Sequence, residues 1–519
     1  MTLAYARRAT ARGGVWSAFQ WLPALTAAAY AATVAAMGAR IVRELGWDTD
    51  TSAPLVLAEK LRGSGRVYLP HISTWTSLWF ELATRNLPGH RELWQTTPYL
   101  FAVFGAILVG WATARVAGRW AGVTAFATAL IVGPLALRAL FTVAFHVTTP
   151  FSACVLALFL VLLDQRRASL LVIPVGLLSG ANAASDPLLW PAGLIPFAIA
   201  SAVLAATTRS RRIAIRAGAM LVLSVAVAVF ANALMHSLGY HELGTGQQIA
   251  SIRSLPGHVV LLGRLTALLG GANYAIAGPY PREPLRALLA LLVLIAAIAP
   301  VVAAVTYARR RTEPVTRAYA LYWGAAVVIL AIVFVCTSNA ANLGAGSFDY
   351  LLTFAPAAGA AVALLSFPSA RARALVAAAI AVVGVTNIAG VVHGRAGTPG
   401  GLLGTYERPL VRLLVDKGVT HGYSSYWDAQ NLTWQSGMRI FVAPVARCDV
   451  QGKQLCPLRF SVIASWYRAR SGPSFLIVDP TAAFVTTPPP LVRRATASYR
   501  FGRLTVYLFP YDLARDIAS

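Results

Sequence analysis

Carboxylates gather in one short stretch of this chain. Of the twelve acidic residues in positions 1–392, six fall between residues 44 and 95, namely Glu44, Asp48, Asp50, Glu59, Glu81 and Glu92. Asp48 and Asp50 follow closely on an apolar run at 16–41. A carboxylate there can take the proton from a hydroxyl group that attacks an electrophile, which is general base catalysis. We predict Asp50 as the base and Asp48 as the second candidate. The alternative is that both carboxylates solvate a loop end or receive snorkelling arginines.

Cationic side chains in two loops could complement these carboxylates. They are Lys60, Arg62 and Arg66 in the same stretch, and Arg253, His258 and Arg264 within residues 236–284. Cations stabilise the negative charge that develops on a leaving group. We therefore predict a substrate-binding role for all six side chains.

Asp186 is a separate case, because it interrupts an apolar stretch together with Asn182, Ser185 and Pro187. Ionisable groups at membrane depth are rare and usually face a cavity, which favours a substrate-binding carboxylate. Ser-Asp-Pro also suits the tight turn of a helical hairpin. His146 is interpreted as a buried or interfacial histidine. The sequence shows no metal-ligand spacing; it indicates no certain cofactor and leaves a divalent metal ion open.

The elements that must position these residues are transmembrane helices. Hydrophobic residues make up 57% of the 519 residues, and charged residues only 12%. Soluble domains carry about 25% charged residues, and about 20 apolar residues cross a bilayer. Apolar blocks predict about eleven spans, at 16–41, 97–116, 120–138, 140–163, 168–183, 187–207, 213–235, 285–307, 318–336, 349–367 and 374–392. The segments at 168–183 and 187–207 could also be the halves of one broken helix.

Basic residues set the orientation. Arginine clusters fall on every second connection, at 7–12, 115–119, 166–167, 209–212, 309–311 and 371–373. Cytoplasmic loops are enriched in Lys and Arg, so these connections are expected in the cytoplasm. The N-terminus is then cytoplasmic, and the long loops 44–95 and 236–284 and the C-terminal segment are extracytoplasmic.

The net charge of +25 has two interpretations. One is this loop bias combined with arginine-rich composition; the other is attraction to anionic lipid head groups or a lipid-linked phosphate. Nucleic-acid binding is not expected, because the basic residues are spread over the membrane loops.

The first long loop resembles that of the GT-C superfamily of membrane glycosyltransferases. Residues 48–70, DTDTSAPLVLAEKLRGSGRVYLP, are similar to the family pattern of an acidic pair, a short helix and a Gly-containing turn before an aromatic residue and Pro. Asp50 matches the second acidic position, and Asp48 lies just ahead of the first. Residues 348–356, FDYLLTFAP, are similar to a segment where many members have Arg-Tyr-Leu-Leu-Pro, with Asp349 in the place of the arginine. Residues 138–149 lack the acidic residue that several subfamilies place there.

The resemblance implies a fold and an activity. The fold is an all-α polytopic membrane domain with two interfacial helices in the first outer loop. The activity is transfer of a hexosyl or pentosyl group, usually with inversion, from a polyprenyl-phosphate carrier to a glycan or lipid acceptor of the bacterial cell envelope. The partners are that donor, that acceptor and membrane lipids, and the location is the plasma membrane.

Residues 393–519 are expected to form a small extracytoplasmic α/β domain, separate from the membrane domain at 1–392. Strand-like runs lie at 439–445, 474–479 and 503–509, and helix-like stretches at 405–417 and 424–436. Its aromatic residues could stack on sugars, although core packing is the favoured interpretation. Cys448 and Cys456 could form a disulfide in an oxidising compartment; Cys154 and Cys336 are expected to be apolar fillers within helices.

Two other functions compete with this reading. A transporter or flippase of a lipid-linked saccharide would have ionisable residues paired inside its helices, whereas here they cluster in a loop. A non-enzymatic envelope scaffold would make the composition of that loop incidental.

Overall fold

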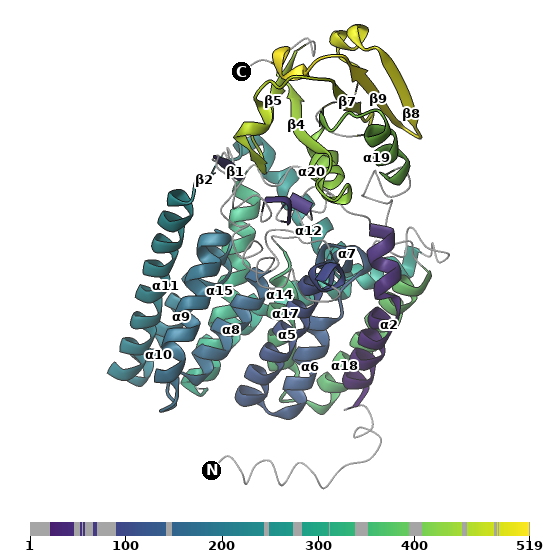
Figure 1. Cartoon of the computed structure of the whole chain (residues 1–519). Coiled ribbons are helices and arrows are strands. Elements are labelled where there is room, and N and C mark those ends of the chain that lie inside the picture. The colour runs from purple at the N-terminus through teal and green to yellow at the C-terminus, as the bar shows by residue number, and fades with distance from the viewer. Residues whose placement is uncertain are drawn as a thin grey trace.

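The computed structural model describes residues 21–45, 52–53, 55–57, 66–69, 90–141, 148–242, 249–272, 283–310, 312–337, 351–393, 407–448, 454–481, 485 and 487–517. It consists of a helical bundle with an α/β domain at one end (Figure 1). The helices of the bundle are α2 (Leu22–Leu45), α5 (His90–Ala117), α6 (Arg119–Leu130), α7 (Pro134–Phe141), α8 (Thr148–Leu162), α9 (Ala168–Ser185), α10 (Ile195–Thr208), α11 (Arg211–Ser237), α12 (Leu255–Leu269), α14 (Glu283–Arg309), α15 (Pro314–Cys336), α17 (Phe354–Ser366) and α18 (Ala370–His393).

The polytopic membrane fold is confirmed. In the described part of the chain, eight helices are long and apolar enough to cross a membrane, and α8 and α17 are shorter apolar helices. Each of the eleven expected segments contains a helix. Segments 168–183 and 187–207 are two separate spans, the second of which begins with a π-helical turn at Trp190–Leu194.

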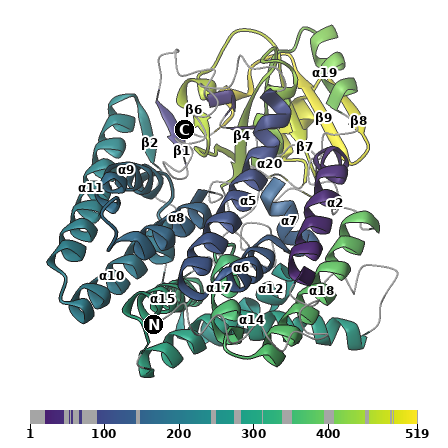
Figure 2. The same cartoon turned by 90° about the horizontal axis from the view of Figure 1, so that it is seen from below.

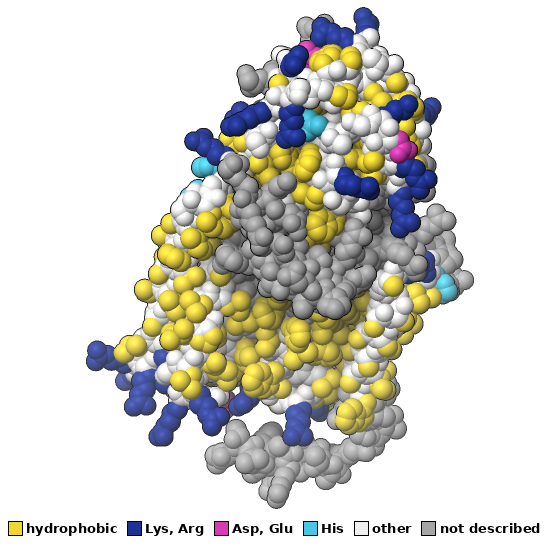
Figure 3. Space-filling view, in the orientation of Figure 1, with side chains coloured by type: hydrophobic (Ala, Val, Ile, Leu, Met, Phe, Trp, Pro, Cys, Tyr) yellow, Lys and Arg dark blue, Asp and Glu magenta, His cyan; other side chains and the backbone are white. Residues whose placement is uncertain are grey.

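Helix α5 lies in the middle of the bundle, where it packs against α6, α8 and α17 (Figure 2). Helices α9 and α11 pair on one side, α2 and α18 on another, and α14 packs against both α15 and α17. Large apolar side chains on the outer helices face outward, such as Leu170, Val222, Phe230 and Leu375 at 67–76% exposure. Figure 3 shows a hydrophobic surface over the bundle, with Lys and Arg at its lower end and on the α/β domain. Such a broad apolar surface is favourable in contact with lipid and unfavourable in contact with water.

The prediction of one continuous helix at 120–138 is wrong, because the helix is broken in its middle. Helix α6 ends at Leu130, and α7 begins at Pro134. Proline has no N–H to donate and disfavours helical geometry in the residue before it. The backbone N–H of Gly133 instead donates to the carbonyl of Leu269, over 2.7 Å, at the end of α12.

Helix α12 was not among the expected segments. It lies inside the loop 236–284 and packs against α7, α14 and α15. Its 15 residues rise about 22 Å at 1.5 Å per residue, which is too short to cross a bilayer.

The C-terminal α/β domain is confirmed. Its six-stranded sheet has the order β5 (Leu455–Pro457), β4 (Phe441–Arg447), β3 (His421–Ser424), β7 (Ser474–Val478), β9 (Leu504–Phe509) and β8 (Ala497–Phe501). The strands β4, β3 and β7 are parallel, and the others are antiparallel to their neighbours. Helices α19 (Glu407–Asp416) and α20 (Tyr426–Gln435) match the two helix-like stretches. The division at residues 392 and 393 stays a prediction, because residues 394–406 lie outside the described part.

The cysteines divide as expected, with one exception. Cys448 and Cys456 form a disulfide across β4 and β5, with Cα atoms 5.7 Å apart. Cys154 is buried in α8, whereas Cys336 is exposed at the last residue of α15 and fills no core. Trp466 is buried in the core of the α/β domain, which supports core packing for that aromatic side chain.

Candidate functional site

Part of the first long loop is buried between the helical bundle and the C-terminal α/β domain. Residues 52–53 and 55–57 are helical and fully buried. Val56 and Leu57 belong to the core that includes Tyr423 and Leu476 of the sheet. Leu55 packs with Trp94 of α5 and Trp434 of α20. Leu55, Val56 and Leu57, from the first of the two helices expected at the membrane interface, are therefore covered by protein.

A second sheet ties this loop to the C-terminal domain. Its strand order is β2 (Tyr240–Glu242), β1 (Val67–Leu69) and β6 (Val462–Ile463). Strand β1 pairs parallel with β2 and antiparallel with β6. The N–H of Ala464 donates to the carbonyl of Arg66 over 2.8 Å. One short sheet thus joins the loop 44–95, the loop 236–284 and the C-terminal domain.

Several predicted site residues cannot be placed. Asp48, Asp50, Lys60 and Arg62 lie outside the described residues, as do Asp349 and His146. Residues 73–87, where the second of the two interfacial helices is expected, also lie outside them. Arg66 is described, and its side chain is exposed at the start of β1. The catalytic assignment of Asp50 and Asp48 therefore stays a prediction.

The cationic residues of the second loop lie on and beside α12. Arg253 is exposed in a 3-10 turn at Ile252–Ser254, one turn before the helix begins. His258 is half-buried, and its Nδ1 lies 2.8 Å from the carbonyl oxygen of Val335 at the end of α15. Arg264 is exposed, and neither arginine pairs with an acidic residue of the described part. Both guanidinium groups are therefore available to an anion.

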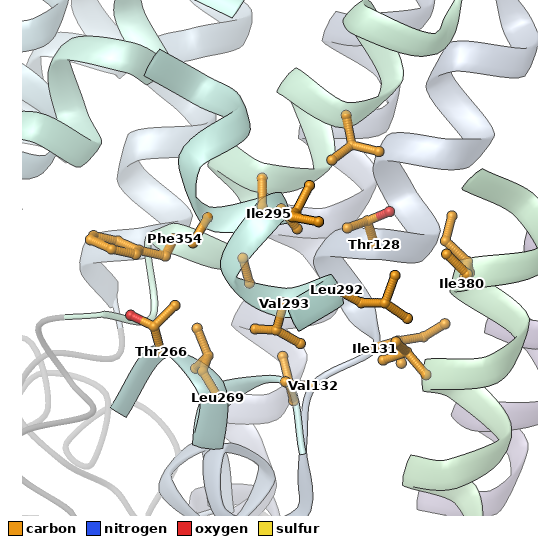
Figure 4. A pocket seen from close by; sticks show the side chains of 18 of the residues that line it. Thr128, Ile131, Val132, Thr266, Leu269, Leu292, Val293, Ile295, Phe354 and Ile380 are labelled. Carbon is orange, nitrogen blue, oxygen red and sulfur yellow. The ribbon is translucent and has the colours of Figure 1, made fainter. Parts of the chain in front are cut away.

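An apolar cavity of about 490 Å³ begins where α12 ends. It is lined by α6, α12, α14, α17 and α18, with Thr266 and Leu269 of α12 in its wall, and it opens to the surface of the bundle, where its lining residues Ile295 and Leu375 are exposed. Figure 4 shows Leu292 and Val293 of α14 across from Ile131 and Ile380. Among the described residues that line it, only Thr128 and Thr266 have polar side chains. This space suits a hydrocarbon chain.

Helix α12 therefore contributes to two surfaces, one cationic and one apolar. Arg264 is exposed on it, and Thr266 in the same turn lines the cavity. Arg264 and Thr266 are two residues apart and therefore project from opposite sides of α12. None of the site residues predicted from the sequence lines this cavity, because its walls are formed by side chains from five helices.

Asp186 lies in the turn after α9 and is fully buried. One carboxylate oxygen accepts the N–H of Leu188 over 2.9 Å, and the other accepts the hydroxyl of Thr149 at the start of α8. Asn182 continues the polar network to Ser152, with its Nδ2 donating over 3.0 Å. These bonds suit a carboxylate that shapes the α9 turn and fixes it against α8, and they leave its substrate-binding role a prediction.

The two interpretations of Asp186 are separable by substitution. We expect Asp186→Asn to melt within a few degrees of the wild type, because an amide can accept from Leu188 and donate to Thr149. Asp186→Leu should lower the melting temperature clearly, since it leaves a buried N–H and a hydroxyl without an acceptor, at about 1–3 kcal/mol each. Melting in detergent, followed by tryptophan fluorescence, measures both. A stable Asp186→Asn protein that has lost all activity would instead assign the carboxylate to the substrate.

The C-terminal sheet holds a pair of buried carboxylates at the carboxyl ends of β3 and β7. Ser425 donates to Asp428 over 2.8 Å, and the hydroxyl of Thr481 donates to Asp479 over 2.8 Å. The guanidinium of Arg503 lies 3.5 Å from Asp479. Burial, and then the negative charge of Asp479, raise the pKa of Asp428 to about 7, against the opposing effects of Ser425 and Arg503.

This raised pKa predicts the pH dependence of stability. Between the usual value of 3.8 and about 7, Asp428 keeps its proton in the folded state and loses it on unfolding. Stability contributed by this group is therefore present at low pH and lost as the pH rises toward 7. We expect Asp428→Asn to melt about 5 °C or more above the wild type at pH 8, and to gain less at pH 5. The exposed Asp416→Asn is the control. Equal gains at both pH values would contradict the assignment.

The structure also bears on the open question of a metal ion. Across the described ranges, no three His, Cys, Asp or Glu side chains come together in a way that could hold a metal. Asp48 and Asp50 lie outside those ranges. A divalent ion therefore has no assigned ligands.

Comparisons with known proteins were made for the whole chain. No protein-family model matches it, and no curated protein does. Among solved structures, ArnT from Cupriavidus metallidurans in the apo state is 16% identical with a TM-score of 0.45, over 94% of this chain and 98% of ArnT. The same protein bound to undecaprenyl phosphate is 15% identical with a TM-score of 0.43, over 95% and 98%. The Archaeoglobus fulgidus oligosaccharyltransferase in complex with Zn and sulfate is 15% identical with a TM-score of 0.46, over 77% of this chain and 58% of that one. With TM-scores below 0.5, these similarities concern the overall fold and carry no argument about function.

Proposed function

We propose that this chain is a membrane glycosyltransferase of the GT-C type. It takes a hexosyl or pentosyl group from a polyprenyl-phosphate carrier and gives it to a glycan or lipid acceptor of the bacterial cell envelope. The reaction lies on the outer face of the plasma membrane, with the N-terminus in the cytoplasm. The observation that carries the proposal is the apolar cavity, which is lined in part by the end of α12, the helix that also bears the exposed Arg264.

The donor has the matching chemistry. Its isoprenoid tail is apolar and would occupy the cavity, while its phosphate would be bound by Arg264 of α12. Arg253 lies eleven residues earlier, about 16 Å away along the helix axis, and is too distant to share that phosphate. Arginine binds phosphate oxygens through a planar array of N–H donors. His258 is directed to the carbonyl of Val335, so we assign it to holding α12 against α15 rather than to the phosphate.

The transfer follows from the roles of these residues. The acceptor hydroxyl attacks the anomeric carbon, and its proton passes to Asp50. The bond between that carbon and the phosphate oxygen breaks, and the electron pair leaves with the polyprenyl phosphate, whose charge Arg264 stabilises. Attack from the face opposite the phosphate inverts the anomeric configuration. Asp48 is the second carboxylate of the pair.

The first test is the composition of the envelope. In a strain that lacks this protein, mass spectrometry should find a polyprenyl-phosphate sugar in excess and an envelope glycan or lipid that lacks that sugar. Restoring the wild-type chain should reverse both changes. Unchanged glycans and unchanged lipid-linked sugars would contradict the proposal.

A second test separates the enzyme from a transporter or flippase of lipid-linked saccharides. Transport needs a sealed membrane with two sides, whereas transfer needs only donor, acceptor and enzyme. We expect the purified protein to transfer the accumulated sugar in detergent micelles. A protein active only across sealed vesicles would be a transporter, and one active in neither would fit a scaffold.

A further inference from the structure

A second cationic surface lies away from α12, where three distant segments meet. His236 is in the last turn of α11, His241 is in β2 and Tyr68 is in β1. The ring centroids of Tyr68 and His241 are 6.1 Å apart, and those of His236 and His241 are 6.2 Å apart. The guanidinium carbon of Arg459, from the loop between β5 and β6, lies 5.7 Å from the centre of the Tyr68 ring. We call these four residues the junction cluster.

The small sheet β2-β1-β6 presents this cluster to the outside. Side chains alternate between the two faces of a strand. Val67, Tyr240 and Ile463 pair across the three strands and are buried at 5% exposure or less. Tyr68 and His241 occupy the next register position and are half-exposed. Arg66 is two residues before Tyr68 in the chain and is also exposed, so alternation places it on the same side.

Within the described part of the chain, no acidic side chain forms an ion pair with this surface. Arg459, His236 and Arg66 are exposed. The ion pairs formed wholly among described residues are Arg494 with Asp516 and Arg503 with Asp479, elsewhere in the C-terminal domain. The nearest acidic residue in sequence is Glu242, next to His241. A guanidinium that stacks on an aromatic ring keeps its N–H edges free for an oxyanion.

The position of the cluster indicates where that anion comes from. Helix α11 is a 27-residue apolar span with Arg211 and Arg212 at one end and His236 at the other. In Figure 3 histidine side chains lie at the upper border of the hydrophobic surface, with Lys and Arg just above them. A border between an apolar and a basic surface suits the head-group level of a bilayer, where lipid phosphates lie. Basic groups near a membrane surface contribute about 1 kcal/mol each to binding anionic lipid.

We propose that the junction cluster binds the phosphate of an anionic membrane lipid, and so fixes the C-terminal domain and both long loops against the bilayer. The lipid is distinct from the sugar donor, and this site is separate from the cavity beside α12. The inference concerns binding only and does not depend on the transfer reaction.

The test uses the full-length protein in nanodiscs of phosphatidylcholine, with and without phosphatidylglycerol. Native mass spectrometry after removal of the bilayer counts the lipids that stay bound. We expect the wild type to retain phosphatidylglycerol in preference to phosphatidylcholine. The double variant Arg459→Gln with His241→Gln should bind it about tenfold more weakly or worse. Arg493→Gln, an exposed arginine of the same domain, should behave like the wild type.

Folding and the source of the phosphate are checked separately. Melting in phosphatidylcholine nanodiscs should be the same for wild type and variants; if the double variant is unstable, Arg66→Gln provides a milder loss of charge. Equal retention of phosphatidylglycerol by stable cluster variants and wild type would overturn the proposal. Displacement of the lipid by millimolar inorganic phosphate would overturn the lipid assignment and leave a site for free phosphate.

Discussion

Asp50→Asn is expected to lower the rate of sugar transfer by a factor of about 10²–10⁴, the usual contribution of a general base. Asparagine has nearly the same shape as aspartate, but it cannot take the acceptor's proton at neutral pH. The KM for the donor should change little, because the lipid is held by the cavity and Arg264. Single-turnover transfer from the donor that accumulates in the deletion strain measures the chemical step.

Two further variants test whether the loss of activity in Asp50→Asn reflects the loss of the general base. Asp48→Asn should cost less than Asp50→Asn, since Asp48 is the second carboxylate of the pair. Asp416→Asn, on the exposed surface of α19, should leave transfer unchanged. A well-folded Asp50→Asn protein with wild-type activity would remove Asp50 as the base. If Asp48→Asn alone abolished transfer, the roles of the two carboxylates would be exchanged.

Gly133→Ala is expected to destabilise the whole outer end of the bundle. A Cβ at this position would lie 2.5 Å from the Cα of Gly271 and 2.8 Å from the carbonyl oxygen of Leu268. Both are backbone atoms, so α12 itself must move, and the hydrogen bond from Gly133 to Leu269 is strained. Overpacking of this kind costs about 1–3 kcal/mol or more, which predicts a melting temperature about 5 °C lower or more.

The same change should weaken donor binding, since α12 carries Arg264 and part of the cavity wall. Gly263→Ala is the matched control, because it lies on α12 with no atom within 4 Å of the new Cβ. It should be neutral or slightly stabilising, as alanine favours helix over glycine by about 0.5–1 kcal/mol. Equal melting temperatures for the two variants would show that the contact between residues 133 and 271 is not tight.

The sequence was sufficient for the helices and much less so for their contacts. Runs of about 20 apolar residues predict membrane helices regardless of neighbours, and each expected segment holds one. The break at Gly133 was missed because residues 131–136 remain apolar on both sides of it. Helix α12 was missed because it is too short for a span and lies within a loop of mixed composition. The strands β1, β2 and β6 contain two or three residues each, too few for an alternating pattern.

The same holds for the candidate site, where single residues could be predicted from the sequence but their contacts could not. Asp186 stood out as an acidic residue in an apolar stretch, but its contact with Thr149 is between two helices and has no sequence signature. The residues of the junction cluster come from positions 68, 236, 241 and 459. Nothing in the local sequence links a tyrosine to an arginine so far along the chain. Short motifs therefore identified single residues, while the surfaces that they form required the fold.

The sheet β2-β1-β6 also sets an order of events during synthesis. Strand β1 is made early, but its antiparallel partner β6 emerges only after every helix of the bundle has been made. Until the C-terminal segment has been made, Val56 and Leu57 lack the sheet residues that cover them in the folded protein. Under the proposed function, a chain that lacks about its last hundred residues would therefore insert in the membrane but remain inactive.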